Sequence, residues 1–172
     1  MTILPICPGS HRPYSAILNK GPGFEFDAPV TLMKKHPGTV PPDALLNAAH
    51  VAHKCISEKN DAQGIVIRYV GVDLTGTKMA GNSWNGLRIT DQMLDGCTAA
   101  MVPITLTRVS VIDNGRHPTA DGGALRETVG IAIERSAAGS SRLASLSPAN
   151  WRAAVASLNG NQGGDFADDA VA

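Results

Sequence analysis

Two arginines stand where a cation needs a specific partner. Arg68 lies inside the apolar run 64–74, and Arg108 lies where the apolar alternation of residues 102–112 changes phase. A guanidinium in such a setting must pair with an acid or face a ligand. Ion pairs with Asp73, Glu127 or Glu134 are the structural explanation, and phosphate groups are the functional one. The full set of candidate contacts to an anion or to nucleic acid is Arg68, Arg108, Arg116, Lys34 and Lys35.

Other reactive residue types lack the partners that chemistry requires. The loop 113–121 (DNGRHPTAD) carries Arg116 and His117, a composition that suits anion binding, catalysis or a solvated hairpin tip. His50 and His53 have helical i, i+3 spacing, but a metal site needs a third ligand from elsewhere. Cys97 has no identifiable base beside it. We therefore predict no catalytic residue, no metal and no cofactor.

One segment, Val70–Met79 (VGVDLTGTKM), resembles the phosphate-binding strand and turn of the sugar-kinase/actin superfamily, most closely the repressor/sugar-kinase group. The resemblance implies that Asp73 helps to position a metal and that Gly76, Thr77 and Lys78 lie near nucleotide phosphates. Thr75 stands where the family has its first turn glycine, and no second phosphate motif follows. A strand that ends in a glycine-containing turn is the alternative interpretation.

The charge balance limits the classes of partner. Fifteen basic and fifteen acidic residues give a net charge of zero, and the longest basic run is Lys34-Lys35-His36. Proteins that bind duplex nucleic acid through its phosphates usually carry a basic excess, so a basic-armed binder is not indicated. Three cysteines without CxxC spacing favour neither a disulfide framework nor a zinc site. No apolar run suits a membrane span, and residues 1–10 do not resemble a signal peptide, so we expect cytoplasmic synthesis and no membrane partner.

The elements that would position these residues suggest an α+β fold. Strands are predicted near 24–33, 64–74, 102–112 and 126–135, with the last two joined as a long hairpin. Apolar residues at helical spacing predict a helix over 43–60, and a Ser-Pro start predicts another over 148–159. We therefore expect one domain over 24–160, with a largely antiparallel sheet of about four to five strands packed by two helices. No internal repeat is evident.

The two ends of the chain differ from this domain. Residues 1–23 form a proline- and glycine-rich apolar segment, and 161–172 form an acidic tail. We expect both to be extended arms, and near-zero net charge lets identical copies pack closely. The residues predicted to make assembly contacts are Ile3, Leu4, Ile6, Tyr14 and Phe166.

The sequence thus favours a non-enzymatic role. The leading hypothesis is a self-assembling structural subunit, such as a viral or phage coat or tube protein joined through its arms. Its partners would be identical subunits, with or without enclosed nucleic acid, and its location would be the virion. One alternative is a small cytosolic enzyme or anion-binding protein that uses the 113–121 loop. Another is a small host-interaction or inhibitor protein that binds through the N-terminal arm.

Overall fold

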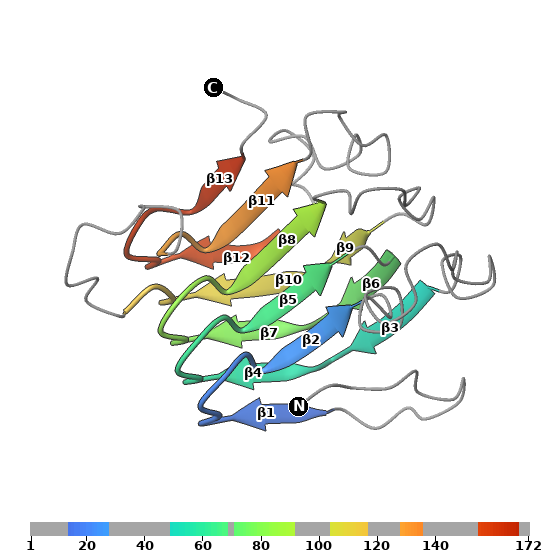
Figure 1. Ribbon diagram of the computed structural model, residues 1–172, viewed down its shortest axis with the longest axis horizontal. Helices are drawn as coiled ribbons and strands as arrows, with labels where there is room; N and C mark the ends of the chain where they lie inside the picture. The colour runs from blue at the N-terminus through green and yellow to red at the C-terminus, as the bar shows by residue number, and fades with distance from the viewer. Residues whose placement is uncertain are drawn as a thin grey trace, which may run out of the picture.

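The chain folds as a parallel β-solenoid (Figure 1). The computed structural model describes residues 14–27, 49–68, 71–91, 104–116, 128–135 and 155–168. Within these ranges every strand pairing is parallel, and the strands form three sheets. No helix long and apolar enough to cross a membrane occurs in these ranges.

The three sheets are named by the strands they contain. Sheet A consists of β2 (Phe24–Asp27), β5 (Ile65–Arg68), β8 (Leu87–Asp91), β11 (Ile131–Arg135) and β13 (Phe166–Asp168). Sheet B consists of β1 (Ser15–Ile17), β4 (Ile56–Glu58), β7 (Lys78–Ala80), β10 (Val109–Ile112) and β12 (Val155–Asn159). Sheet C consists of β3 (Ala49–His53), β6 (Gly71–Thr75) and β9 (Thr105–Thr107).

Successive coils of the chain stack on one another. A complete coil passes through sheets C, B and A, as 49–68 does in the second coil and 71–91 does in the third. The first coil, 14–27, and the fifth, 155–168, contribute described strands to sheets B and A only. Because each coil pairs with its neighbours, the ends of the stack are the first and the fifth coils (Figure 1).

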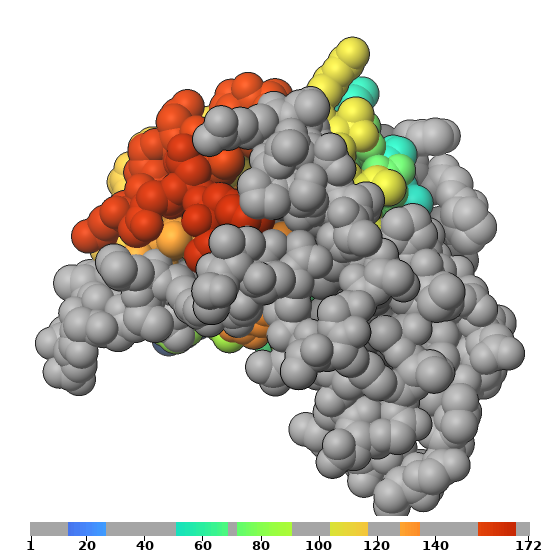
Figure 2. Space-filling view, turned by 90° about the horizontal axis from the view of Figure 1, so that it is seen from above, coloured from blue at the N-terminus to red at the C-terminus, as the bar shows by residue number. Residues whose placement is uncertain are grey.

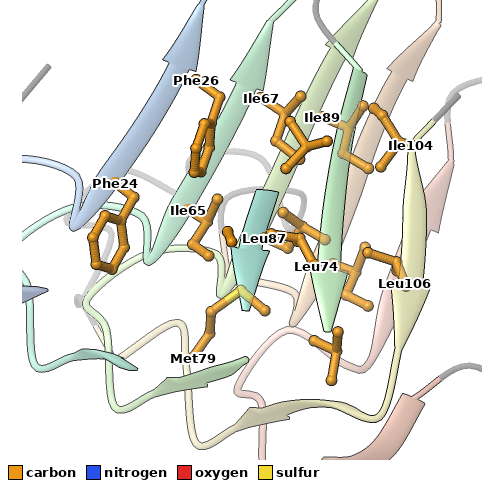
Figure 3. Close-up of a cluster of buried hydrophobic side chains, with 14 of the residues drawn as sticks. Phe24, Phe26, Ile65, Ile67, Leu74, Met79, Leu87, Ile89, Ile104 and Leu106 are labelled. Carbon is orange, nitrogen blue, oxygen red and sulfur yellow. The ribbon is translucent and has the colours of Figure 1, made fainter. Parts of the chain in front are cut away.

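The core is the interior of this stack. Alternate side chains of each strand point inward, including Phe24, Ile65 and Leu87 from sheet A and Leu74 and Leu106 from sheet C (Figure 3). The same positions in consecutive coils stack directly, since Phe24 pairs with Ile65 and Ile65 with Leu87. Each large apolar side chain buried in this way contributes roughly 1.5–3 kcal/mol.

The predicted fold class was wrong. There is no helix among the described residues, the sheets are parallel, and 49–53 and 155–159 are strands where helices were expected. The expected hairpin is also absent, because β10 belongs to sheet B and β11 to sheet A. The described parts of the predicted arms, 14–23 and 161–168, lie in the first and fifth coils.

Corners between sheets explain the mistaken helix. Within a strand the buried positions recur every two residues, but the C-to-B corner adds one residue. Around the C-to-B corner of the second coil the buried residues are therefore Ala52, Cys55 and Ser57, with a step of three at the corner. That step resembles the i, i+3 spacing of a helix.

Both kinds of corner use a residue in the left-handed region. At the C-to-B corner these residues are Lys54, Gly76 and Arg108. At the B-to-A corner they are Leu18, Lys59, Gly81, Asp113 and Gly160. The phase change at Arg108, predicted to be a bulge, is therefore a corner between two strands of different sheets.

An asparagine follows each left-handed residue of the B-to-A corner, and these asparagines form a ladder. Its members are Asn19, Asn60, Asn82, Asn114 and Asn161. Asn60 donates from its main-chain N at 3.1 Å and from Nδ2 at 2.8 Å to Oδ1 of Asn82, and Asn82 repeats both contacts to Asn114. Asn82 Nδ2 also donates to the Ser57 carbonyl at 3.1 Å. The ladder therefore satisfies buried polar groups of successive coils.

A row of glycines lies against this ladder. A Cβ on Gly64 would lie 2.7 Å from Asn82 Nδ2, and one on Gly86 would lie 2.8 Å from Asn114 Nδ2. Gly23 and Gly130 face Asn60 and Asn161 in the same way. Glycine is required here by the close approach of the next coil, and not by a positive φ.

The ladder and the glycine row reveal an internal repeat, contrary to the sequence prediction. The pattern Asn-x3-Gly-Φ-x-Φ, in which Φ is a large apolar residue, occurs at 19–26, 60–67 and 82–89. The fourth coil has the same residues with an insertion between Asn114 and Gly130. In the fifth coil Asp165 replaces the glycine.

Candidate functional site on the outer face of sheet C

The outer face of sheet C gathers polar side chains from three strands. Val51, Asp73 and Thr105 form one row across β3, β6 and β9, and the next row contains His53, Thr75 and Thr107. The alternate residues Ala52, Leu74 and Leu106 are buried in the core. The strict alternation of these strands therefore turns both rows away from the core.

His53, Asp73 and Thr75 form a hydrogen-bonded cluster on this face. Nε2 of His53 lies 3.1 Å from Oδ2 of Asp73, and the Thr75 hydroxyl donates to Oδ1 of Asp73 at 2.9 Å. The side chains of His53 and Asp73 are 49% and 38% exposed. The carboxylate is thus held by its neighbours but remains open to solvent.

The surroundings of Asp73 favour its charged form. Partial burial raises the pKa of this carboxyl, but hydrogen bonds from His53, Thr75 and Thr105, with the nearby His53 charge, outweigh burial. The net effect is that the pKa of Asp73 lies below its ordinary value. Asp73 therefore carries a negative charge that accepts hydrogen bonds from His53, Thr75 and Thr105.

This geometry can orient an imidazole but does not form a nucleophilic site. A carboxylate that is hydrogen-bonded to a ring nitrogen of a histidine fixes the orientation of the imidazole, as in general acid–base sites. A nucleophile would have to bond to the histidine, whereas Thr75 bonds to Asp73 instead. The described ranges also contain no group of three residues that could hold a metal ion.

The predicted anion contacts that lie in the described ranges do not meet at one place. Arg68, on the outer face of sheet A, forms an ion pair with Glu25, a partner that the sequence did not suggest. Arg116 lies after β10, with Nε donating to the Asp113 carbonyl at 3.1 Å. Arg108 is exposed at the C-to-B corner, beside the sheet C face. Of the three arginines, only Arg108 lies beside the candidate site.

Several predicted residues fall outside the described ranges. For the chemical candidates these are Lys34, Lys35, Cys97 and His117. For the assembly contacts they are Ile3, Leu4 and Ile6. The two described assembly candidates, Tyr14 and Phe166, are partly buried and pack against the core of their own chain.

The segment that resembles the kinase phosphate turn has a structural use here. Thr77 is buried and its hydroxyl donates to the Ala52 carbonyl at 2.6 Å, while Lys78 pairs with Glu58. The turn amides of Gly76 and Lys78 donate to the carbonyls of Thr107 and Cys55. Donors that would cradle a phosphate are therefore occupied by the neighbouring coils.

The His53–Asp73–Thr75 cluster was not predicted, because the spacing of the sequence placed His53 on a helix. The outward residues share a spacing that is visible in the sequence, since V-A-H, D-L-T and T-L-T each have a buried middle residue. The pairing of these triplets depends on which coils stack, and the intervening loops differ in length. No family model, curated protein or solved structure matches this chain.

Proposed function

We propose that the chain is a structural subunit that self-assembles through the first-coil end of its solenoid. The supporting observation is the location of the exposed apolar side chains. Ile17 is 48% exposed, Leu18 is 74% exposed and Val51 is 56% exposed. They are the large hydrophobic residues exposed in the described part of the chain, and they lie on β1, directly after it, and on β3.

These strands are also edge strands. Among the described strands, β1, β2 and β3 each have a neighbour on one side only, at the same end of the stack (Figure 1). An edge strand offers main-chain donors and acceptors to another chain. Burying an exposed aliphatic side chain there would contribute up to roughly 1.5–3 kcal/mol.

The opposite end has a feature that disfavours continued stacking. In the fifth coil Asp165 occupies the position that glycine has in the other coils. If a further coil were stacked on the fifth, the side chain of its ladder asparagine would approach the Cβ of Asp165. In the preceding coil, a Cβ on Gly130 would lie 2.5 Å from Asn161 Nδ2. Within the fifth coil, Nδ2 of Asn161 donates to the carboxylate of Asp165 at 3.4 Å. A copy added in register on the fifth coil would therefore clash.

The two ends together favour a closed pair of copies over an open filament. A pair that meets through two identical first-coil ends uses one self-complementary surface and leaves no free interface of that kind. The fifth coil, which is visible as the red region of Figure 2, would face away from the contact. The narrower hypothesis of a viral or phage coat protein, with a virion location and enclosed nucleic acid, stays a prediction.

Light scattering coupled to size-exclusion chromatography tests this proposal. We expect the wild-type mass to be that of two chains, and Ile17→Thr or Val51→Thr to shift it toward one chain. Ile112→Thr is the matched control, since Ile112 lies in β10 within sheet B and away from that end. A wild-type protein that stays monomeric as its concentration rises would refute the proposal.

A further inference from the structure

We propose that the C-to-B corner beside the candidate site binds a tetrahedral oxyanion, a phosphate or sulfate group. The corner row consists of Lys54, Gly76 and Arg108, which directly follow the paired residues His53, Thr75 and Thr107. Lys54 and Arg108 are exposed. The inference does not depend on self-assembly.

The corner brings two cations to either side of a glycine. The main-chain N of Lys54 donates to the Thr75 carbonyl at 2.7 Å, and that of Gly76 donates to the Thr107 carbonyl at 2.8 Å. These bonds hold the three corner residues in consecutive coils. Two strand spacings place the Cα atoms of Lys54 and Arg108 about 9–10 Å apart, a separation that two long side chains can span around one anion.

Gly76 leaves the space between them open. The nearest atom to a Cβ built on Gly76 is Cγ of Lys54, at 3.6 Å. The lysine stem therefore runs beside the glycine. An anion above Gly76 would lie within reach of both flanking side chains.

Neither cation is neutralised within the described part of the chain. The ion pairs there involve other bases, and the nearest carboxylate on the face, Asp73, is bound to His53 and Thr75. Thr107 is exposed in the row directly before the corner row, so its hydroxyl can add a neutral donor. Two charged donors and one hydroxyl suit an oxyanion with several acceptor oxygens.

The other corner provides an internal comparison. Lys59 also has a positive φ and lies beside a glycine, since its Cγ is 3.7 Å from a Cβ built on Gly81. Across Gly81, however, the next corner residue is Asp113. A cation facing an acid does not make an anion site, so Lys59 is a matched control for Lys54.

Titration of the ¹⁵N-labelled full chain with inorganic phosphate, and separately with sulfate, tests the inference. Sodium chloride at equal ionic strength is the reference. We expect saturable shifts of the Lys54, Gly76 and Arg108 amide signals with at least one oxyanion, and the tighter probe identifies the preferred group. Lys54→Ala and Arg108→Ala should each weaken binding about tenfold, because each removes a charge-assisted contact.

The control variant distinguishes a site from general charge attraction. Lys59→Ala should bind the same probe as the wild type does. Shifts no larger than those with chloride would overturn the inference, as would an equal loss of affinity in Lys59→Ala. A monomeric protein that binds phosphate or sulfate as expected would refute only the assembly proposal. A dimeric protein that binds neither oxyanion would refute only the oxyanion inference.

Discussion

The two corners that the structure describes, C-to-B and B-to-A, share a backbone conformation but differ in what surrounds it. Each corner places residues such as Lys54 and Lys59 at positive φ. At the B-to-A corner the next residue is a buried asparagine that links several coils. At the C-to-B corner the next residue in the third coil is Thr77, which makes one hydrogen bond to Ala52. The B-to-A corner therefore carries more of the stability, and the C-to-B corner is freer to serve binding.

Substitution of a row glycine should give the largest effect. A Cβ on Gly86 would lie 2.4 Å from Val111 Cγ1 and 2.8 Å from Asn114 Nδ2. Gly86→Ala should therefore cost about 3 kcal/mol or more in the free energy of unfolding, measured by urea titration. Gly76→Ala meets only Lys54 Cγ at 3.6 Å and should cost about 1–2 kcal/mol through its positive φ. Equal losses would contradict the contrast between the corners.

Removal of a ladder asparagine should rank second. Asn82→Ala removes the acceptor of the Asn60 main-chain N, one of the acceptors of Asn60 Nδ2, and a donor to the Ser57 carbonyl. Buried polar groups left unpaired should cost about 3 kcal/mol together. Thr77→Val at the other corner removes one donor and should cost about 1–2 kcal/mol by the same unfolding measurement. A greater loss in Thr77→Val would reverse our assignment.

Relief of the positive φ should have similar, smaller effects at the two corners. Lys54→Gly and Lys59→Gly each replace a residue at a φ of 55° or 53° by one that tolerates it. Both should gain up to about 1 kcal/mol in thermal or urea unfolding. If the oxyanion inference holds, only Lys54→Gly should lose phosphate or sulfate binding. A stability gain in only one of the two variants would contradict the expectation that positive φ costs the same at the two corners.

The smallest expected effect is the pH dependence from Asp73. Because the folded-state pKa of Asp73 is lowered, its contribution is complete above the unfolded value of 3.8 and is lost as pH falls through the folded value. The carboxylate is more than one-third exposed, so the contribution should be below about 1 kcal/mol. The stability difference between wild type and Asp73→Asn should therefore shrink from neutral pH into the acid range. A difference that grows on acidification would contradict this.

The sequence by itself determined the inward-facing residues of the strand at 24–27. The alternation of Phe24 and Phe26 follows from apolar spacing, whereas the strand predicted near 64–74 covers parts of two strands, β5 and β6, that belong to different sheets. The Asn-x3-Gly-Φ-x-Φ pattern was also present, although it was not recognised. Such features depend on neighbours along the chain, and local physical rules are sufficient for them.

Only the tertiary structure decided that the strands stack in parallel coils. The spacing of Ala52 and Cys55 satisfies a helix as well as a corner, so local pattern could not choose between them. Likewise, His53 and Asp73 meet because β3 pairs with β6 in a specific register. Register between coils depends on the whole ladder of contacts, and loops of unequal length conceal it in the sequence.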